Sequence, residues 1–273
     1  MTYRTGVHPI EHLRYVARAR GADASSLVRE AATALASLRA DHANLVIASR
    51  RIVERHPEVG ALWSMCARLL MSDDPTELAW QIADEIDDDA TPRVIAGAFP
   101  DDATVLTVGW PDTTGDALMR RGDVSVWCAD SRHEASAFMQ RLERFDIECE
   151  PIPHESLARA AHLADVVIVE ANAASTQRAL APVGSHVLAA VARSVGTPVW
   201  LTTASGCRLP VEYVDAIGGR VVDTAESWDL DVDDLPLDLV THVASADGVS
   251  GDVVAELRSD CPYAPELLRF SPF

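Results

Sequence analysis

Small and polar residues follow the most strand-like stretches of this chain. Glu170 and Asn172 come just after the apolar run VVIV, and Arg132 follows the run VSVWC. Gly184 and Ser185 stand where a loop passes into an apolar stretch with helical character. An arginine side chain and the free N–H groups at the start of a helix both bind phosphate-type anions. Because ligands in open parallel sheets sit at the carboxyl ends of the strands, this pattern predicts an anion site there.

Each of these residues also has a simpler interpretation. Arg132 is consistent with an ion-paired surface residue, since all 23 basic residues of the chain are arginine. Gly184 is consistent with a turn glycine, and Asn172 with an Asx turn that bonds its own loop. Arg20, near the end of an amphipathic stretch, is consistent with a residue that complements a helix dipole. The sequence leaves these alternatives open.

The cysteines and histidines do not form a metal-binding pattern. The five cysteines are widely spaced and include no C-x-x-C pair, so neither a disulfide framework nor a zinc site is expected. His186 follows Ser185, but neighbours on a helix point to different faces, which argues against a nucleophile–base pair. The motifs G-x-G-x-x-G and G-x-x-x-x-G-K-[ST] are absent from the sequence. We therefore expect no metal and no nucleotide cofactor.

The elements that position the candidate residues fall into two groups. In the first ninety or so residues, apolar residues recur at three- and four-residue spacing, which predicts helices. From about Arg93, short β-rich runs alternate with amphipathic stretches, as in a parallel sheet with crossover helices. The runs cover residues 104–109, 124–128, 147–152, 166–170 and 198–203, with 220–223 as a weaker sixth. We predict an α/β protein with a helical N-terminal domain (residues 1–91) followed by a Rossmann-like parallel-sheet domain (92–273).

Charge and composition narrow the possible partners. The chain has 273 residues, 48% of them hydrophobic, a formal net charge of −19 and no lysine. Because a surface with this much negative charge repels phosphate backbones, we expect no nucleic-acid binding. No apolar run is long enough for a membrane span and the start of the chain has no apolar signal region, so we expect a cytoplasmic protein without membrane contact. The composition indicates a halophile, with a GC-rich mesophile as the alternative.

Several motifs together resemble a known family. They run from RGADASSLVREAATAL near the start, through the strand–loop set, to DLPLDLVTHVASADGV near the end. In these stretches the chain is similar to the family that joins the alpha, beta and delta regulatory subunits of translation initiation factor 2B with two sugar-phosphate isomerases. Those isomerases act on methylthioribose 1-phosphate and ribose 1,5-bisphosphate. The altered motifs indicate a diverged, archaeal-type member.

The resemblance places two isomerase positions at residues that cannot do the same chemistry. The isomerases carry a cysteine in a T-H-C loop after the first strand of the α/β domain, and Gly109 stands there in this chain. They carry an aspartate in a G-A-D motif after a later strand, and Asn172 stands there. Glycine offers no acid or base, and an amide does not titrate. We therefore expect no catalytic residues at these positions.

Other family positions survive in outline. The motif E-[ST]-R-P appears as DSRH and keeps Arg132, which in the isomerases contacts a substrate phosphate. Arg20-Gly21 begins a sequence like the R-G-A turn that faces the same site. N-K-x-G-T appears as APVGS, where Gly184-Ser185 keeps the helix start while Pro182 replaces the lysine. The resemblance thus implies a ligand site made of Arg20, Gly21, Arg132, Asn172, Gly184 and Ser185.

The resemblance implies a binding protein more readily than an enzyme. We expect an initiation factor 2B alpha-subunit-like protein, a non-catalytic regulator that binds a partner subunit, a phosphorylated metabolite, or both. The partner would be a second copy, as a homodimer, or a related subunit, and the metabolite a sugar phosphate or nucleoside monophosphate. The alternative is a sugar-phosphate isomerase that uses other groups near the strand ends, namely Asp112, Asp130, Glu170 or Cys128.

Overall fold

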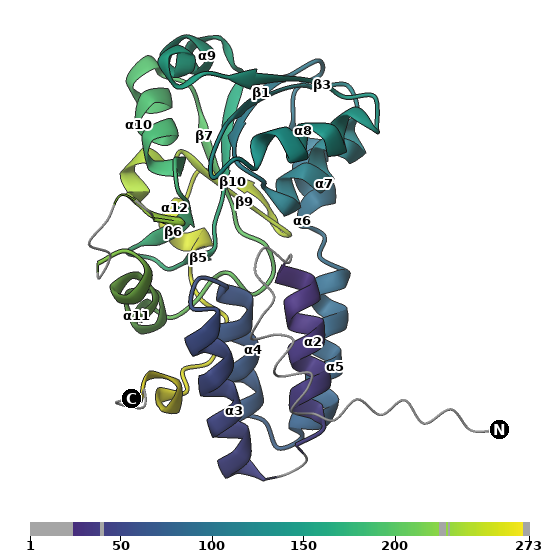
Figure 1. The fold of residues 1–273 in the computed structure, drawn as a ribbon, viewed down its shortest axis with the longest axis vertical. Helices are drawn as coiled ribbons and strands as arrows, with labels where there is room; N and C mark the ends of the chain where they lie inside the picture. Colours follow the sequence, from purple (N-terminus) through teal and green to yellow (C-terminus); the bar gives the residue numbers. More distant parts are fainter. Residues whose placement is uncertain (1–23, 39–40, 224–227, 229, 270–273) are drawn as a thin grey trace, which may run out of the picture.

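An all-helical block and an α/β block lie end to end along the long axis of the molecule (Figure 1). This computed structural model describes residues 24–38, 41–223, 228 and 230–269. The predicted fold class, a helical N-terminal part followed by a mostly parallel α/β part, is confirmed. Arg20 and Gly21 lie outside the described residues, so their place in a site stays a prediction.

The helical block is built from amphipathic helices with clear start signals. Its members are α2 (Ala24–Ala36), α3 (His42–Arg55), α4 (Gly60–Leu70) and α5 (Pro75–Asp87). Asp41 caps α3 by accepting the backbone N–H groups of Ala43 and Asn44, and Asp74 caps α5 in the same way. Almost every residue of α4 is buried, which makes this helix the centre of the block.

The described residues of the α/β block form a seven-stranded sheet in the order β10-β9-β7-β4-β1-β2-β3. All neighbouring strands are parallel except β10, which runs antiparallel to β9. The strands are β1 (Thr104–Val108), β2 (Ser125–Ala129), β3 (Glu148–Ile152), β4 (Val166–Glu170), β7 (Val199–Thr202), β9 (His242–Ser245) and β10 (Gly248–Ser250). The first five coincide with the five predicted β-rich runs.

Helices cover both faces of this sheet (Figure 1). One face packs against α6 (Thr91–Ala98), α7 (Asp112–Arg121) and α8 (Ala135–Glu143), and the other against α9 (Leu157–Leu163) and α10 (Ser185–Val195). Successive residues of a strand point to opposite faces, so in β4 Val166 and Ile168 join one core while Val167 and Val169 join the other. The continuous apolar run VVIV is therefore explained by a strand buried on both sides.

A small antiparallel sheet lies between the two blocks. It consists of β5 (Ala173–Ala174), β6 (Ala179–Pro182) and β8 (Val232–Leu235), with α11 (Val211–Val221) beside it. The sixth predicted strand, at residues 220–223, is wrong: Arg220 and Val221 end α11 and the next two residues form a turn. The helix continues there because Tyr213, Val214 and Ile217 carry its apolar face into the core.

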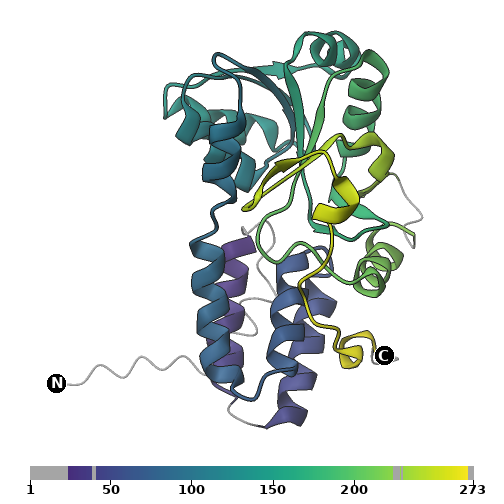
Figure 2. The same ribbon diagram turned by 180° about the vertical axis from the view of Figure 1, so that it is seen from behind.

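The core of the helical block includes residues from the far end of the chain. Figure 2 shows the C-terminal segment running down from the sheet along the helices, past α12 (Val253–Glu256) to the 3₁₀ turn Pro265–Leu268. Leu267 is fully buried there, and Arg50 of α3 donates to the carbonyl of Glu266 at 2.6 Å. A boundary between residues 91 and 92 stays a prediction, because segments from both sides of it share this core.

Candidate functional site

Three loops meet at the carboxyl ends of β1 and β2. Gly109 follows β1 with a φ of +68°, and a Cβ atom added to it would lie 3.3 Å from the Cβ of Ser131. Ser131 follows β2 and donates its hydroxyl to the carbonyl of Val183 at 2.7 Å. Gly184 in turn lies against Val108 at the end of β1. The structure thus brings the loops that hold Gly109, Arg132 and Gly184 to one edge of the sheet.

The anion-binding groups of these loops contact carboxylates of the same chain. One oxygen of Asp233 accepts the backbone N–H of Gly184 at 2.7 Å and that of His186 at 3.1 Å, at the start of α10. The Nη2 atom of Arg132 lies 2.9 Å from a carboxylate oxygen of Asp231. The carboxylates of Asp231 and Asp233 thus contact the groups that the sequence predicted to bind an anion.

Asn172 is held by its backbone. Its N–H donates to the carbonyl of Leu180 at 2.8 Å, and its own carbonyl accepts the N–H of Gly60, the first residue of α4, at 3.0 Å. Its side-chain Oδ1 is buried without a hydrogen-bond partner among the described residues. The expected Asx turn is therefore absent from this part of the structure, and Asn172 joins the small sheet to the helical block.

Glu170 ends the central strand with its carboxylate at the start of α7. Its two oxygens accept the backbone N–H groups of Thr113 and Thr114 at 3.2 and 3.1 Å. The pKa of Glu170 is raised to about 7: burial raises it most and the charge of Asp112 adds to this, while the two N–H groups act in the opposite direction. A carboxyl group with a pKa near neutrality can take up and release protons under physiological conditions.

Glu134 is a site residue that the sequence did not indicate. Its Oε2 atom lies 3.7 Å from the point where a Cβ of Gly109 would stand, so it fills the space beside that glycine. Burial raises the pKa of Glu134, the charges of Asp112 and Asp231 raise it further, and Arg132 lowers it. Its position depends on the loop after β2, which returns toward the end of β1, and no local pattern reveals that path.

Asp231 and Asp233 were also missed by sequence reasoning. The only available signal is the spacing of acidic residues in the run DLDVDD. Within that run, Val232, Asp233 and Asp234 belong to β8, a short strand of the small sheet. The partners of Asp233 at the start of α10 lie almost fifty residues earlier in the chain, so spacing along the sequence could not connect them.

The cysteines near the site are poor nucleophiles. Cys128 is fully buried at the end of β2, with its sulfur 3.4 Å from the carbonyl of Gly109. Burial, together with the nearby charge of Asp130, raises the pKa of Cys128 to about 12. Burial likewise raises the pKa of Cys207 to about 12. Since the thiolate is the reactive form, both thiols stay protonated and inert near neutral pH.

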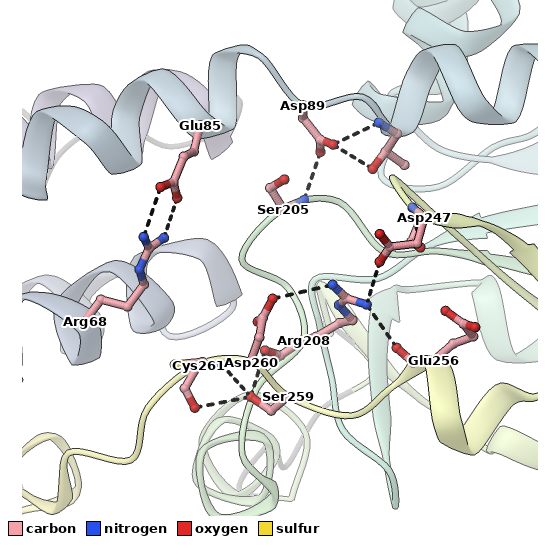
Figure 3. A network of polar contacts seen from close by, with 12 residues as sticks. Arg68, Glu85, Asp89, Ser205, Arg208, Asp247, Glu256, Ser259, Asp260 and Cys261 are labelled. Atoms are coloured by element: carbon pink, nitrogen blue, oxygen red, sulfur yellow. Dashed lines mark hydrogen bonds and ion pairs between the residues drawn. The ribbon is translucent and has the colours of Figure 1, made fainter.

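A polar junction connects the helical block to the α/β block (Figure 3). Arg208, in the loop after β7, lies 3.5 Å from carboxylate oxygens of both Asp247 and Asp260. Across a cavity of about 330 Å³, Arg68 of α4 forms a two-point ion pair with Glu85 of α5 at 2.6 and 3.1 Å. The arginines of this cavity are thus ion-paired with neighbouring acids of their own block, and the N–H of Ser205 crosses to the carboxylate of Asp89, just after α5, at 2.9 Å.

Among the described residues, no group of three or more histidine, cysteine, aspartate or glutamate side chains is placed to hold a metal ion. No helix in the same residues has the length and apolar character needed to cross a bilayer.

The comparisons with known proteins find similarity in structure and none in sequence. No family model and no curated protein matches the sequence. Among solved structures, a translation initiation factor eIF-2B from Pyrococcus horikoshii OT3 is similar, with a TM-score of 0.73 and 15% identity over 89% of this chain and 97% of that one. The eIF2B beta subunit from Chaetomium thermophilum is similar with a TM-score of 0.71 and 13% identity, over 92% of each chain.

A third similar structure is an assembly. It is the tetrameric eIF2B-beta2-delta2 complex from C. thermophilum, with a TM-score of 0.72 and 16% identity over 91% of this chain and 94% of that one. These matches cover nearly the whole of each chain, so both the helical block and the sheet take part in the similarity. The chain therefore has the fold of the translation initiation factor 2B subunits.

Proposed function

We propose that this chain is a non-catalytic, initiation factor 2B alpha-subunit-like protein that acts by binding a partner subunit. The single observation that carries the proposal is the state of the anion-binding groups. The start of α10 holds Asp233, and Arg132 holds Asp231, so the chain's own carboxylates take the positions that a substrate phosphate would need.

The chemistry of the neighbouring residues supports the same proposal. Gly109 and Asn172 stand where the resemblance to the isomerases puts a cysteine and an aspartate, and Asn172 has its carboxamide oxygen buried. The cysteines near the strand ends have a raised pKa and stay protonated. Loss of one acid–base group costs a factor of roughly 10²–10⁴ in rate. Here both groups of the isomerase reaction are replaced, at Gly109 and at Asn172.

A partner subunit is the remaining role that the fold supports. One of the similar solved structures is a complex of beta and delta subunits, and this chain spans 94% of the matching subunit. We propose that the chain pairs with a second copy of itself or with a related subunit, and that it works in the cytoplasm.

Two measurements on the purified protein test this proposal. Turnover of ribose 1,5-bisphosphate and of methylthioribose 1-phosphate is expected to stay at the level of a protein-free control. Sedimentation velocity is expected to show a dimer, or a mixed oligomer once a related subunit is added. Isomerisation of either substrate would contradict the non-catalytic role, and a monomer with and without the related subunit would contradict the partner-binding role.

The alternative function is a sugar-phosphate isomerase that uses non-standard groups, and Glu170 is the observation that favours it. This carboxyl group has a pKa of about 7 at the end of the central strand, which suits general acid–base catalysis. If turnover is found, Glu170→Gln should lower kcat by about 10²–10⁴, as expected for loss of a general acid or base. The matched control is Glu150→Gln, an exposed glutamate of β3, which should leave kcat unchanged.

A further inference from the structure

Residues 231–234 include three aspartates and are here called the acidic segment. The segment is held firmly beside the candidate site. Val232 and Leu235 are buried and anchor β8, which pairs with β6 in the register Pro182 with Val232 and Ala181 with Asp233. The N–H of Val183 donates to the carbonyl of Asp231 at 3.0 Å. The backbone of the acidic segment is therefore bonded directly to the chain that leads into α10.

Alternation along β8 turns the acidic side chains in two directions. Asp231 and Asp233 are two residues apart and point to one face, toward Arg132 and the start of α10. Asp234 points to the other face, where its carboxylate lies 3.1 Å from Nε of Arg178. The two faces of one short strand thus serve different cationic partners.

The start of α10 is built to hold an anion. The N–H groups of Gly184 and His186 converge on one oxygen of Asp233, at 2.7 and 3.1 Å. Gly184 takes a φ of +96°, a left-handed conformation that glycine adopts readily and that leads the chain from β6 into α10. Between them, Ser185 is fully buried, and its hydroxyl has no hydrogen-bond partner among the described residues. Helix dipole and free N–H groups favour negative charge at this point.

An internal carboxylate competes strongly with a free ligand. The acidic segment is attached within the same domain, so it faces the site at an effective concentration on the order of millimolar or more. A free phosphate would have to displace both Asp233 from α10 and Asp231 from Arg132. It would also have to approach against the charge of the remaining carboxylates.

We propose that the acidic segment is an internal pseudo-ligand: Asp231 and Asp233 occupy the phosphate-binding groups and close the site to free phosphorylated ligands. This inference rests on the proposed function. It gives the physical reason why Arg132 and the start of α10 do not bind the phosphate of a substrate. The ligand class that the site excludes is the phosphate monoester, recognised by one guanidinium and the N–H groups of α10.

Phosphate titration of carboxylate-free variants tests the inference. The double variant Asp231→Ala/Asp233→Ala removes both carboxylates, and inorganic phosphate is titrated by calorimetry into it and into the wild type. We expect the variant to bind phosphate at least about tenfold more tightly, as a charge-assisted contact allows. Backbone amide NMR signals of Gly184 and His186 should shift with phosphate in the variant and stay unchanged in the wild type.

Matched variants separate this effect from a change in net charge or a loss of folding. Asp73→Ala/Asp238→Ala removes two exposed carboxylates elsewhere and should bind phosphate no better than the wild type. Asp233→Asn keeps the hydrogen-bond acceptor and loses the charge, so it should show intermediate binding and keeps the test valid if the double variant unfolds.

Equal phosphate binding in the wild type, the charge control and both site variants would overturn the inference. That outcome would leave the proposed partner-binding role in place, since that role depends on the assembly and turnover measurements. Conversely, isomerase turnover by the wild type would contradict the proposed function whatever the phosphate titration shows.

Discussion

The carboxyl group of Glu170 is subject to two opposing influences. Partial burial and the charge of Asp112 favour the protonated form, while the N–H groups of Thr113 and Thr114 favour the carboxylate. Burial has the larger effect, and the pKa rises to about 7. Burial also raises the pKa of Glu134 at the same edge of the sheet, so both glutamates are harder to ionise than a glutamate in water.

The raised pKa of Glu170 predicts that the contribution of this residue to the free energy of unfolding falls as pH rises. Glu170 is protonated in the folded state up to about pH 7, whereas an unfolded glutamate loses its proton near pH 4.3. Its contribution is therefore fully present below about pH 4.3 and is lost as pH approaches 7, by up to about 3 kcal/mol. Glu170→Gln mimics the protonated group, so its stability relative to the wild type should increase from pH 5 to pH 8.

Urea unfolding at pH 5, 6, 7 and 8 measures this difference. Glu150→Gln is the control, because that glutamate is exposed and should follow the wild type at every pH. Parallel stability curves for the wild type and Glu170→Gln would show that the Glu170 carboxyl titrates as in water.

At the scale of elements, the contact between α4 and the small sheet joins the two blocks. Gly60 begins α4, and its N–H donates to the carbonyl of Asn172. A Cβ added to Gly60 would lie 2.5 Å from that carbonyl oxygen and 3.3 Å from Cα of Ala173. Both neighbours are backbone atoms of a paired strand, so neither moves aside without disturbing the small sheet.

Gly60→Ala is therefore expected to destabilise the protein by about 1–3 kcal/mol, as overpacking does. The control is Gly97→Ala in α6, where an added Cβ meets nothing within 4 Å. That change should be neutral or stabilise by up to about 1 kcal/mol, because alanine favours helix over glycine. Denaturant unfolding of both variants checks the pair, and equal midpoints for the two would refute the close contact at Gly60.

At the scale of the whole molecule, negative charge exceeds positive charge by 19. Several arginines already lie between two acids: Arg178 contacts Asp223 and Asp234, and Arg121 contacts Asp101 and Asp123. The acids in excess of these pairs repel one another across the surface.

Salt is therefore expected to stabilise the folded protein. Ions screen repulsion between exposed charges, and the Debye length falls from about 10 Å at 0.1 M salt to about 3 Å at 1 M. The thermal midpoint should rise between 0.05 and roughly 1 M KCl, where this screening becomes short-ranged. Scanning calorimetry measures the midpoint at each KCl concentration. A flat or falling midpoint in KCl would favour the GC-rich mesophile over the halophile.

The sequence by itself determined the elements that carry a clear local pattern, either a continuous apolar run or apolar residues at helical spacing. The run VVIV predicts β4 because every residue of it is buried, and the helix beginning at Ser185 shows in the apolar spacing that follows. Strands β8, β9 and β10 escaped prediction because they are three or four residues long and mix polar or small residues with one or two apolar ones, unlike the four-residue β7, VWLT. The run at 220–223 looked like a strand because valine favours strands, yet packing of α11 outweighs that preference.

The same division holds at the candidate site. Position after a strand or before a helix is a local property, so Arg132, Glu170 and Gly184 could be selected from the sequence. The partners of these residues come from segments distant in the chain. Asp233 of β8 accepts a hydrogen bond at the start of α10, and Glu170 accepts one at the start of α7, more than fifty residues away. The free energy that brings them together comes from burial of residues such as Val232 and Leu235, and only the tertiary structure shows which surfaces that burial joins.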